Sequence, residues 1–343
     1  MTTVAITMGC PTGIGPEIIL RSLEKKSWGP GVSPVILGDI NILSKCAAEL
    51  NIENPCVTWQ PGTKPADNTT PVVQLSNLDA GTVAWGKPNI STAHAMAKYI
   101  ETAVRFSQQG IVDAITTCPI SKDALNQAGY KFPGHTEMLA DLTDTRQYRY
   151  AMMMAGKKLK VTLVTIHCPL AKVAELLSIE AIYSLIVTTF NALKIDFNLD
   201  SPKIGVAGLN PHGGENNLFG CEEETLLIPA IRRAEGMGIK VIGPLPPDTI
   251  FFKAAQGDFD AVVCMYHDQG LIPFKLLHFY DGVNVTLGLP VVRTSVDHGT
   301  AYDIAGKGIA HPDSLIEAVN MAAKISRNRT ILPKNPLKVK KDG

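Results

Sequence analysis

The sequence predicts an α/β fold in which helices cover largely parallel sheets. Strand-like apolar runs alternate with amphipathic helical patterns along almost the whole chain, and Gly and Pro residues separate them. Alternation of this kind is typical of parallel strands joined by helical crossovers. The chain has 343 residues, of which 45% are hydrophobic, and this is enough for two domains with a core each.

The N-terminal part of the chain contains three strand-like runs with helical patterns between them. In order, we expect a strand at 3–7, a helix that begins at Pro16 after a Gly-rich turn, a strand at 33–37, a helix near 40–50, a helix at 95–109 and a strand at 112–117. Residues 60–90 are rich in Pro, Gly, Asn and Thr, so we expect an extended loop there.

The rest of the chain continues this alternation. The expected elements are strands at 150–155 and 160–166, a helix near 180–194, a strand at 203–209, a helix near 222–236, strands at 240–243, 260–266 and 283–287, and a last helix near 312–328. The tail at 333–343 is basic, and we expect it to be frayed.

Composition and charge argue against several classes of protein. Lys+Arg and Asp+Glu balance at 32 each, which gives no basic face for nucleic acid. The seven cysteines are scattered without a CxxC pair, which suits a reducing cytosol better than a disulfide framework. We see no signal-peptide pattern and no run near the roughly 18 apolar residues of a membrane span. We therefore expect a cytoplasmic protein that binds neither nucleic acid nor membranes.

Three strand-like runs lead into a histidine. His167 and His267 directly follow such runs, and His212 follows one after a short Asn-Pro insertion. Ligands of open α/β sheets bind outside the carboxyl ends of the strands, where three neutral imidazoles would suit a catalytic metal site. Zn, Ni, Co or Fe suits imidazole, and substrate oxygens would extend the choice to Mn or Mg. A capping or hydrogen-bonding role for each histidine is the alternative, and the residues alone leave both open.

Two glycine-containing turns could bind anions. The turn 8–18 has the pattern GxxxGxG, which is neither GxGxxG nor a P-loop, so a tight strand-to-helix turn competes with a phosphate cradle. His135 and Thr136 follow Pro-Gly and open a helical stretch. They could cap this helix, or bind an anion together with its first N–H groups.

Several charged residues lie on or beside strand-like runs. Lys122 follows the run at 112–117 and is a candidate for charge recognition or proton transfer. Lys275, Asn284 and Arg293 lie in the dense segment 275–303. Lys and Arg together could hold a phosphate, with Arg giving a bidentate grip, although each alone could equally be a surface or ion-pair residue.

Six segments, taken together, resemble one enzyme family. They occur in order along the chain and read MGCPTGIGPEI, FPGHTEML, LNPHGGE, GPLPPDT, YHDQG and GVNVTLGLPVVRTSVDHGTA, and the match as a whole runs from about residue 4 to about residue 328. This resembles the 4-hydroxythreonine-4-phosphate dehydrogenase (PdxA) family of vitamin B6 biosynthesis. The resemblance implies two α/β/α domains with a cleft between them, similar to isocitrate and isopropylmalate dehydrogenases. Residues 1–125 with 290–335 would form the cofactor-side domain, and 126–289 the substrate, metal and dimerisation domain of a homodimer with shared active sites.

The resemblance also implies roles for individual residues. The metal ligands would be His167, His212 and His267, one of them contributed across the dimer. The substrate-binding residues would be His135, Thr136, Lys275, Asn284 and Arg293. By similarity to isopropylmalate dehydrogenases, the residues near the adenosine of NAD would be His298, Gly299, Thr300, Ala301 and Asp303. The candidates for the general base are Lys122, Asp248 and Asp268.

The implied reaction is oxidation of the 3-hydroxyl of 4-phosphohydroxy-L-threonine by NAD or NADP, followed by loss of CO2 to give 3-amino-2-oxopropyl phosphate. A divalent ion (Zn, Mg, Co or Mn) would stabilise the charge that develops on oxygen. The sequence departs from the common family pattern at Cys10, Thr12 and Ser121, which bears on the substrate. D-Threonate or D-erythronate 4-phosphate is therefore an alternative substrate. A metal-dependent phosphate-ester hydrolase and a non-enzymatic binding protein are more distant alternatives.

Overall fold

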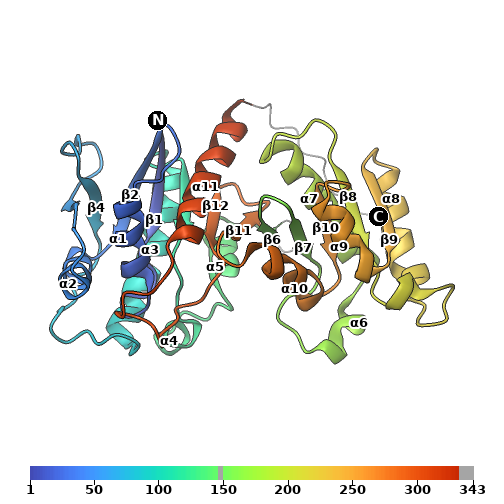
Figure 1. The fold of residues 1–343 in the computed structure, drawn as a ribbon, viewed down its shortest axis with the longest axis horizontal. Coiled ribbons are helices and arrows are strands. Elements are labelled where there is room, and N and C mark those ends of the chain that lie inside the picture. The colour runs from blue at the N-terminus through green and yellow to red at the C-terminus, as the bar shows by residue number, and fades with distance from the viewer. Residues whose placement is uncertain (146–149, 332–343) are drawn as a thin grey trace. The chain divides into compact units, whose positions relative to one another are not determined.

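The computed structural model describes residues 1–145 and 150–331 (Figure 1). The predicted frayed tail at 333–343 lies outside these residues. The chain divides into two compact units: unit 1 is residues 1–145 with 289–327, and unit 2 is residues 146–288 with 328–343. The chain first passes from unit 1 to unit 2 after Thr145, whereas the sequence analysis placed this boundary after residue 125. The helix that begins at His135 belongs to unit 1 because it packs on the long helix before it.

Unit 1 is built on a parallel sheet with the strand order β3-β4-β2-β1-β5-β12. Its strands are β1 (Thr2–Thr7), β2 (Val32–Gly38), β3 (Cys56–Thr58), β4 (Thr70–Gln74), β5 (Ala114–Thr117) and β12 (Arg293–Val296). Its helices are α1 (Gly15–Lys25), α2 (Ile40–Leu50), α3 (Ile90–Gln108), α4 (Lys122–Gln127), α5 (His135–Leu142) and α11 (Asp313–Ile331), whose last residues count with unit 2. Buried strands such as β1 read as continuous apolar runs because both faces of the sheet are covered.

The segment 60–90 is not wholly the extended loop that its composition predicted. Residues 70–74 form β4, which pairs in parallel with β2 and β3. The reason is the short apolar core of this stretch, Val72 and Val73, which is buried in the sheet. The Pro- and Gly-rich residues on either side form the turns that their composition indicates.

The buried carboxylate of Asp39 organises the junction between β2, α2 and β4. It caps α2 by accepting from the N–H of Asn41 at 3.0 Å. It also accepts from Gln74 Nε2 at 3.1 Å, from the Ser76 hydroxyl at 2.7 Å and from the N–H of Leu78 at 2.8 Å. These bonds satisfy a fully buried charge with local donors, which fixes where the chain leaves the sheet.

Unit 2 has a mixed sheet with the strand order β11-β6-β7-β10-β8-β9. Its strands are β6 (Ala151–Ala155), β7 (Lys160–Leu163), β8 (Lys203–Ala207), β9 (Lys240–Leu245), β10 (Ala261–Cys264) and β11 (Val283–Leu287). The pairs β11–β6 and β6–β7 are antiparallel, and the remaining pairs are parallel. The sequence predicted largely parallel sheets, but β6 and β7 are joined by too few residues for a helical crossover.

Helices pack on both faces of the unit 2 sheet. They are α6 (Val173–Leu176), α7 (Ile179–Ile195), α8 (Ile228–Glu235), α9 (Pro247–Ala255) and α10 (His267–His278), with short helices at Leu170–Lys172, Pro211–Gly214 and Glu223–Leu227. Val161 and Leu163 of β7 lie in one core cluster with residues of α9 and α10. Thr162 between them bonds Thr189 of α7 at 3.0 Å, so α7 covers the opposite face.

The close seat of α10 on the sheet depends on Gly270. A Cβ placed there would lie 2.8 Å from Leu163 Cδ2 and 3.0 Å from Cys264 Sγ. The first turn of α10 therefore lies directly on β7 and β10, where any larger residue would push the helix away. None of the helices in the described part of the chain is long and apolar enough to cross a membrane.

We expect Asp39→Ala to destabilise the protein by roughly 2–4 kcal/mol, because it removes a helix cap and leaves buried donors without their acceptor. The change would be measured as a shift in the urea unfolding curve. Asp67→Ala is the matched control, since the Asp67 side chain is 88% exposed and contacts only Lys64 at 3.7 Å among the ion pairs of the described residues. Equal shifts for the two variants would contradict the role of Asp39.

Candidate functional site

The carboxyl ends of three adjacent strands in unit 2 carry the three predicted metal-binding histidines. Strand β10 lies between β7 and β8 and is parallel to both, so the three strands end at one edge of the sheet. His167 follows β7, His267 follows β10, and His212 follows β8. The three histidines therefore follow strands that end at the same edge of one sheet, and this is the edge at which α/β proteins bind ligands.

The structure brings His167 and His267 together. Their ring centroids are 5.9 Å apart, with the rings tilted by 39°. Backbone hydrogen bonds continue beyond the strands toward them, from Val164 N to Cys264 O at 2.9 Å and from Thr165 N to Met265 O at 3.1 Å. The pair is accessible, because His167 is exposed and His267 is only partly covered.

Asp268 orients the imidazole of His267. Its Oδ1 lies 2.7 Å from His267 Nδ1. An ionised carboxylate has no proton to donate, so it can only accept a hydrogen bond from that nitrogen. Nδ1 therefore carries the proton and Nε2 is left as the lone-pair nitrogen. A carboxylate behind an imidazole in this way is typical of metal-ligating histidines. Asp268 was predicted as a candidate general base, and this geometry favours a positioning role.

His212 lies on a sharply turned loop that a buried carboxylate holds. Its backbone is left-handed, with φ 55°, and Gly213 and Gly214 continue in positive φ. Glu223 accepts from the N–H of Asn210 at 2.7 Å and from its side-chain amide at 2.8 Å. The ring of His212 packs near Phe219, at 6.1 Å between centroids.

Within residues 1–145 and 150–331, no group of three or more His, Cys, Asp or Glu side chains could hold a metal ion in a single chain. His167 and His267 supply two adjacent imidazoles, a donor type that fits Zn²⁺, Co²⁺ or another divalent ion. Further ligands would have to come from substrate, water or a second chain. The three-histidine set thus stays a prediction.

The other predicted residues of unit 2 lie on three different elements. Lys275 is half-buried on α10 and Asn284 is half-buried on β11. The Oδ1 atom of Asn284 is buried and has no hydrogen-bond partner among the described residues. Asp248 lies exposed in the first turn of α9. An unsatisfied buried oxygen is costly without a ligand or water, which marks Asn284 as a candidate binding residue.

Unit 1 gathers a cationic group around the N-terminus of α5. Arg293 begins β12, is 2% exposed and donates from Nη2 to Thr117 Oγ1 at 2.7 Å. Burial lowers the pKa of its guanidinium to about 9, and nearby Glu137 opposes that change, so the group stays charged at neutral pH. Thr117 and Glu137 were not predicted as site residues, since nothing in their sequence positions marks them as partners of Arg293.

His135 is the neutral member of this group. Burial, and then the charges of Arg293 and Lys122, hold its pKa well below the ordinary value of 6.5. Its Nε2 is buried, and no hydrogen-bond partner for it exists in the described part of the chain. Residue Gly134 gives α5 no side-chain cap, so the first N–H groups of the helix point toward the same region as His135 and Thr136. This arrangement suits a phosphate or carboxylate.

The Gly-rich turn after β1 packs tightly against neighbouring backbone. The N–H groups of Cys10, Gly13 and Ile14 are already bonded to backbone carbonyls. A Cβ at Gly13 would lie 3.0 Å from the Thr300 carbonyl, so the turn and the loop 298–303 touch closely. The structure thus has a tight strand-to-helix turn here, and these three N–H groups are not available to an anion.

The predicted cofactor loop rests on this turn and on α1. Ile14 N donates to Thr300 O at 3.1 Å, and the buried carboxylate of Glu17 accepts from the N–H of Ala310 at 2.8 Å. Ala301 has a left-handed backbone with φ 43°. The remaining residues of the predicted set lie along the same loop, with Gly299 and Asp303 exposed and His298 half-buried.

Two of the three departures from the common family pattern, Cys10 and Ser121, bond the hydroxyl of Tyr302, and the third, Thr12, contacts Cys10. Cys10 Sγ lies 3.3 Å from Thr12 Oγ1 and 3.3 Å from Tyr302 Oη. Burial raises the pKa of Tyr302, the hydrogen bond with Cys10 raises it further, and the one with Ser121 lowers it. The raised pKa keeps the Tyr302 hydroxyl protonated at neutral pH. The sequence analysis identified Cys10, Thr12 and Ser121 as departures from the family pattern, but it did not identify Tyr302.

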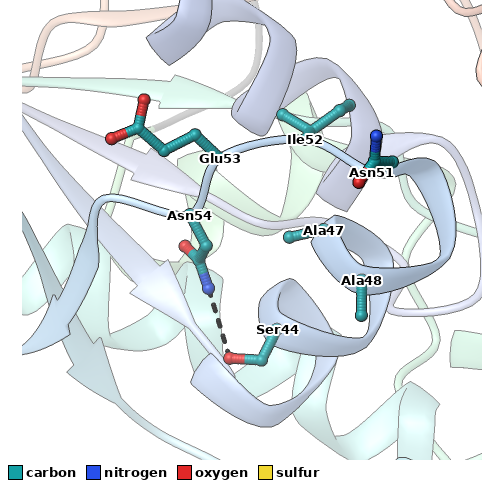
Figure 2. Close-up of a pocket in the computed structure, with 7 residues that line it drawn as sticks. All are labelled: Ser44, Ala47, Ala48, Asn51, Ile52, Glu53 and Asn54. Carbon is teal, nitrogen blue, oxygen red and sulfur yellow. Dashed lines mark hydrogen bonds between the residues drawn. The ribbon is translucent and has the colours of Figure 1, made fainter.

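A hollow of about 460 Å³ lies elsewhere in unit 1, at the end of α2 (Figure 2). Its lining residues are Ser44, Ala47, Ala48, Asn51, Ile52, Glu53 and Asn54. Asn51 ends α2 in a left-handed conformation, and Asn54 Nδ2 donates to Ser44 Oγ at 3.2 Å across the hollow. None of the predicted site residues lines it.

The family model of the pyridoxal phosphate biosynthetic protein PdxA matches residues 31–322. The chain belongs to the PdxA family. A 4-hydroxythreonine-4-phosphate dehydrogenase of Desulforapulum autotrophicum is 51% identical over 324 residues, which are 93% of this chain and 94% of that protein. The resemblance that the six sequence segments indicated is therefore confirmed.

Other PdxA-family relatives show the range of activities and the fold. A D-threonate 4-phosphate dehydrogenase of Cupriavidus necator is 42% identical over 332 residues, covering 96% of this chain and 98% of that protein. The crystal structure of 4-hydroxythreonine-4-phosphate dehydrogenase from Klebsiella pneumoniae matches with a TM-score of 0.86 and 38% identity, over 95% of this chain and 100% of that chain. This match confirms the predicted α/β fold.

The low pKa of His135 makes stability depend on pH. The unfolded chain binds a proton at His135 near pH 6.5 and the folded chain only at lower pH, so stability is full above pH 6.5 and falls as the pH drops below it. Between pH 7.5 and 5.0 we expect the wild type to lose about 1–2 kcal/mol more than His135→Gln in urea unfolding. His94→Gln, at an exposed position, should keep the wild-type slope. An equal pH dependence of the unfolding free energy in the wild type and in His135→Gln would contradict this, because it would mean that His135 is protonated as readily in the folded protein as in the unfolded chain.

Proposed function

We propose that this protein is a metal- and nicotinamide-dependent dehydrogenase of pyridoxal phosphate biosynthesis. It oxidises the 3-hydroxyl of 4-phosphohydroxy-L-threonine, and the 3-oxo acid then loses CO2 to give 3-amino-2-oxopropyl phosphate. The observation that carries the proposal is membership of the PdxA family, with 51% identity to a relative of that activity over nearly the whole chain.

The substrate phosphate is proposed to bind in unit 1. Arg293 and Lys122 supply positive charge, and Arg293 can grip two oxygens at once. His135 is neutral and its buried Nε2 can donate to or accept from the substrate according to its tautomer. The hydroxyl of Thr136 and the first N–H groups of α5 complete the proposed set. In unit 2, Lys275 and Asn284 are proposed as further substrate contacts.

A divalent ion is proposed to bind His167 and His267, with His212 as a third ligand from another copy of the chain. Such an ion polarises the substrate oxygen and stabilises negative charge on it, and Zn, Mg, Co or Mn would serve. Asp268 holds the ring of His267 through Nδ1 and leaves Nε2 for coordination. A histidine binds a metal ion through the lone pair of a neutral imidazole.

The adenosine of NAD or NADP is proposed to bind along the loop that contains His298, Gly299, Thr300, Ala301 and Asp303. The loop is fixed from behind by Glu17 and by the Gly-rich turn, which leaves its exposed residues available to a ligand. A preformed loop of this kind lowers the ordering cost of binding.

Lys122 is the proposed group for proton transfer. It belongs to the cationic group around His135, whose pKa its charge lowers. Asp268 is engaged by His267, and Asp248 lies exposed on α9. A group that transfers a proton must lie close to the substrate. We therefore prefer Lys122, which lies near other proposed substrate-binding residues, over the carboxylates of Asp248 and Asp268.

We further propose that the active form is a homodimer. Unit 2 exposes several large apolar side chains on and after α10, namely Ile272, Leu276, Leu277, Phe279 and Tyr280. A contiguous apolar surface of this kind is typical of a protein interface. We propose that a second copy covers this surface and supplies the third histidine to the pair formed by His167 and His267.

The second candidate function is oxidation of D-threonate or D-erythronate 4-phosphate. It is favoured by the 42% identical relative that is named a D-threonate 4-phosphate dehydrogenase, and by the cluster of Cys10, Thr12, Ser121 and Tyr302. A carboxylate at position 10 would be available to an ammonium group, whereas a thiol is not. A phosphate-ester hydrolase or a binding protein has no comparable observation in its favour.

The direct test follows formation of reduced cofactor with 4-phosphohydroxy-L-threonine, and in parallel with D-threonate 4-phosphate, each with and without a chelator. We expect chelator-sensitive turnover with the first substrate. Turnover with the second alone would move the protein to sugar-acid metabolism. Release of phosphate without cofactor would contradict the dehydrogenase assignment.

We expect Arg293→Lys to raise KM for the phosphorylated substrate by about 10–100-fold with a smaller change in kcat, because a point charge replaces a bidentate contact. Arg105→Lys, at an exposed position on α3, is the control and should leave KM unchanged. An unchanged KM in Arg293→Lys would remove Arg293 from the site.

A further inference from the structure

Gln269, in the first turn of α10, ties together the ends of two strands through a buried amide. The residue is 7% exposed. Its Oε1 accepts from the N–H of Met265 at 2.7 Å, and its Nε2 donates to the carbonyl of Gly208 at 2.6 Å. Met265 directly follows β10 and Gly208 directly follows β8. One side chain thus satisfies two backbone groups on neighbouring strands.

The third strand end is joined through the same residue, Met265. Its carbonyl accepts from the N–H of Thr165 at 3.1 Å and from the Thr165 hydroxyl at 2.8 Å. Thr165 is 8% exposed and Met265 is fully buried. Thr165, Met265, Gln269 and Gly208 therefore form one continuous hydrogen-bonded chain across three strand ends, which we call the strand-end bracket.

Each backbone segment in the bracket leads to one of the predicted metal ligands. Thr165 precedes His167 by two positions, Met265 precedes His267 by two, and Gly208 precedes His212 by four. We propose that Gln269 is a positioning residue: it sets the backbone positions of His167 and His267 in one copy of the chain, and that of the His212 loop which the same copy offers to another, and thereby the affinity for the divalent ion. This inference rests on the proposed metal dependence.

The chemistry of the bracket requires a glutamine. The side chain must accept at one end and donate at the other, which an amide does and an ionised carboxylate cannot. Asparagine is shorter by one methylene and cannot span the same two groups. The orientation of the amide is fixed by its partners, because a flip would place Nε2 against an N–H and Oε1 against a carbonyl.

The loop that carries His212 has a second anchor, so loss of Gln269 should shift the loop rather than unfold it. Asn210 is held by Glu223 through its N–H at 2.7 Å and its side-chain amide at 2.8 Å. Gly270 independently seats α10 on the sheet. Gln269→Met, which keeps the volume and removes both hydrogen bonds, therefore tests the bracket in a folded protein.

The experiment titrates the metal-free full-length protein with Co²⁺ and follows its visible absorption, which reports both affinity and ligand geometry. We expect Gln269→Met to raise the dissociation constant by about 10–100-fold. Thr189→Val is the matched control, because it removes a buried side-chain hydrogen bond to Thr162 on the opposite face of the sheet, and it should bind Co²⁺ as the wild type does.

Thr165→Val breaks the bracket at its other end and decides the question if Gln269→Met does not fold. It should weaken Co²⁺ binding by about 3–10-fold. Wild-type affinity in a folded Gln269→Met protein, or in Thr165→Val if the first variant does not fold, would overturn the inference. His267→Ala distinguishes a wrong role for Gln269 from a wrong metal site. If His267→Ala abolishes Co²⁺ binding while Gln269→Met and Thr165→Val leave it unchanged, the metal site is supported and the role of Gln269 is contradicted. Absence of Co²⁺ binding in the wild type would overturn both.

Discussion

The parallel pairing of β7, β10 and β8 is the constraint on which the unit 2 site depends. Parallel neighbours end at one edge, so the residues that follow them meet without any local sequence motif. Apolar residues buried on both faces fix the register of β10, in which Val262 lies opposite Val161 and Gly205. A shift by one residue would exchange the faces of the strand and move His267 away from His167.

Both groups of candidate residues combine a polar anchor with a nitrogen left for a ligand. In unit 2, Asp268 engages Nδ1 of His267 and leaves Nε2. In unit 1, Thr117 accepts a hydrogen bond from one end of the Arg293 guanidinium, and burial, followed by the charges of Arg293 and Lys122, keeps His135 neutral. Anchoring of this kind orients the reactive atom before the ligand arrives, which reduces the entropy cost of binding.

The sequence was sufficient for the fold class and for the residues that end the strands, because both follow from hydrophobic periodicity and its interruptions. It was not sufficient for β4, a short apolar run inside a Pro- and Gly-rich segment, nor for the antiparallel direction of β6 and β7, since a run buried on both faces reads alike in either direction. The sequence also did not reveal which residues interact with the predicted site residues or with the segments that carry them. Glu137, Thr117 and Gln269 act through contacts with residues distant in the chain, and only the folded structure reveals such contacts.

The central claim is that the strand-end histidines of unit 2 hold a catalytic divalent ion. Anomalous diffraction from crystals grown with Zn²⁺ tests it most directly. The account predicts an anomalous peak about 2.0–2.1 Å from ring nitrogens of His167 and His267, with His212 of a second copy as the third ligand. A fully occupied Zn²⁺ site elsewhere, with no peak between these two rings, would contradict it.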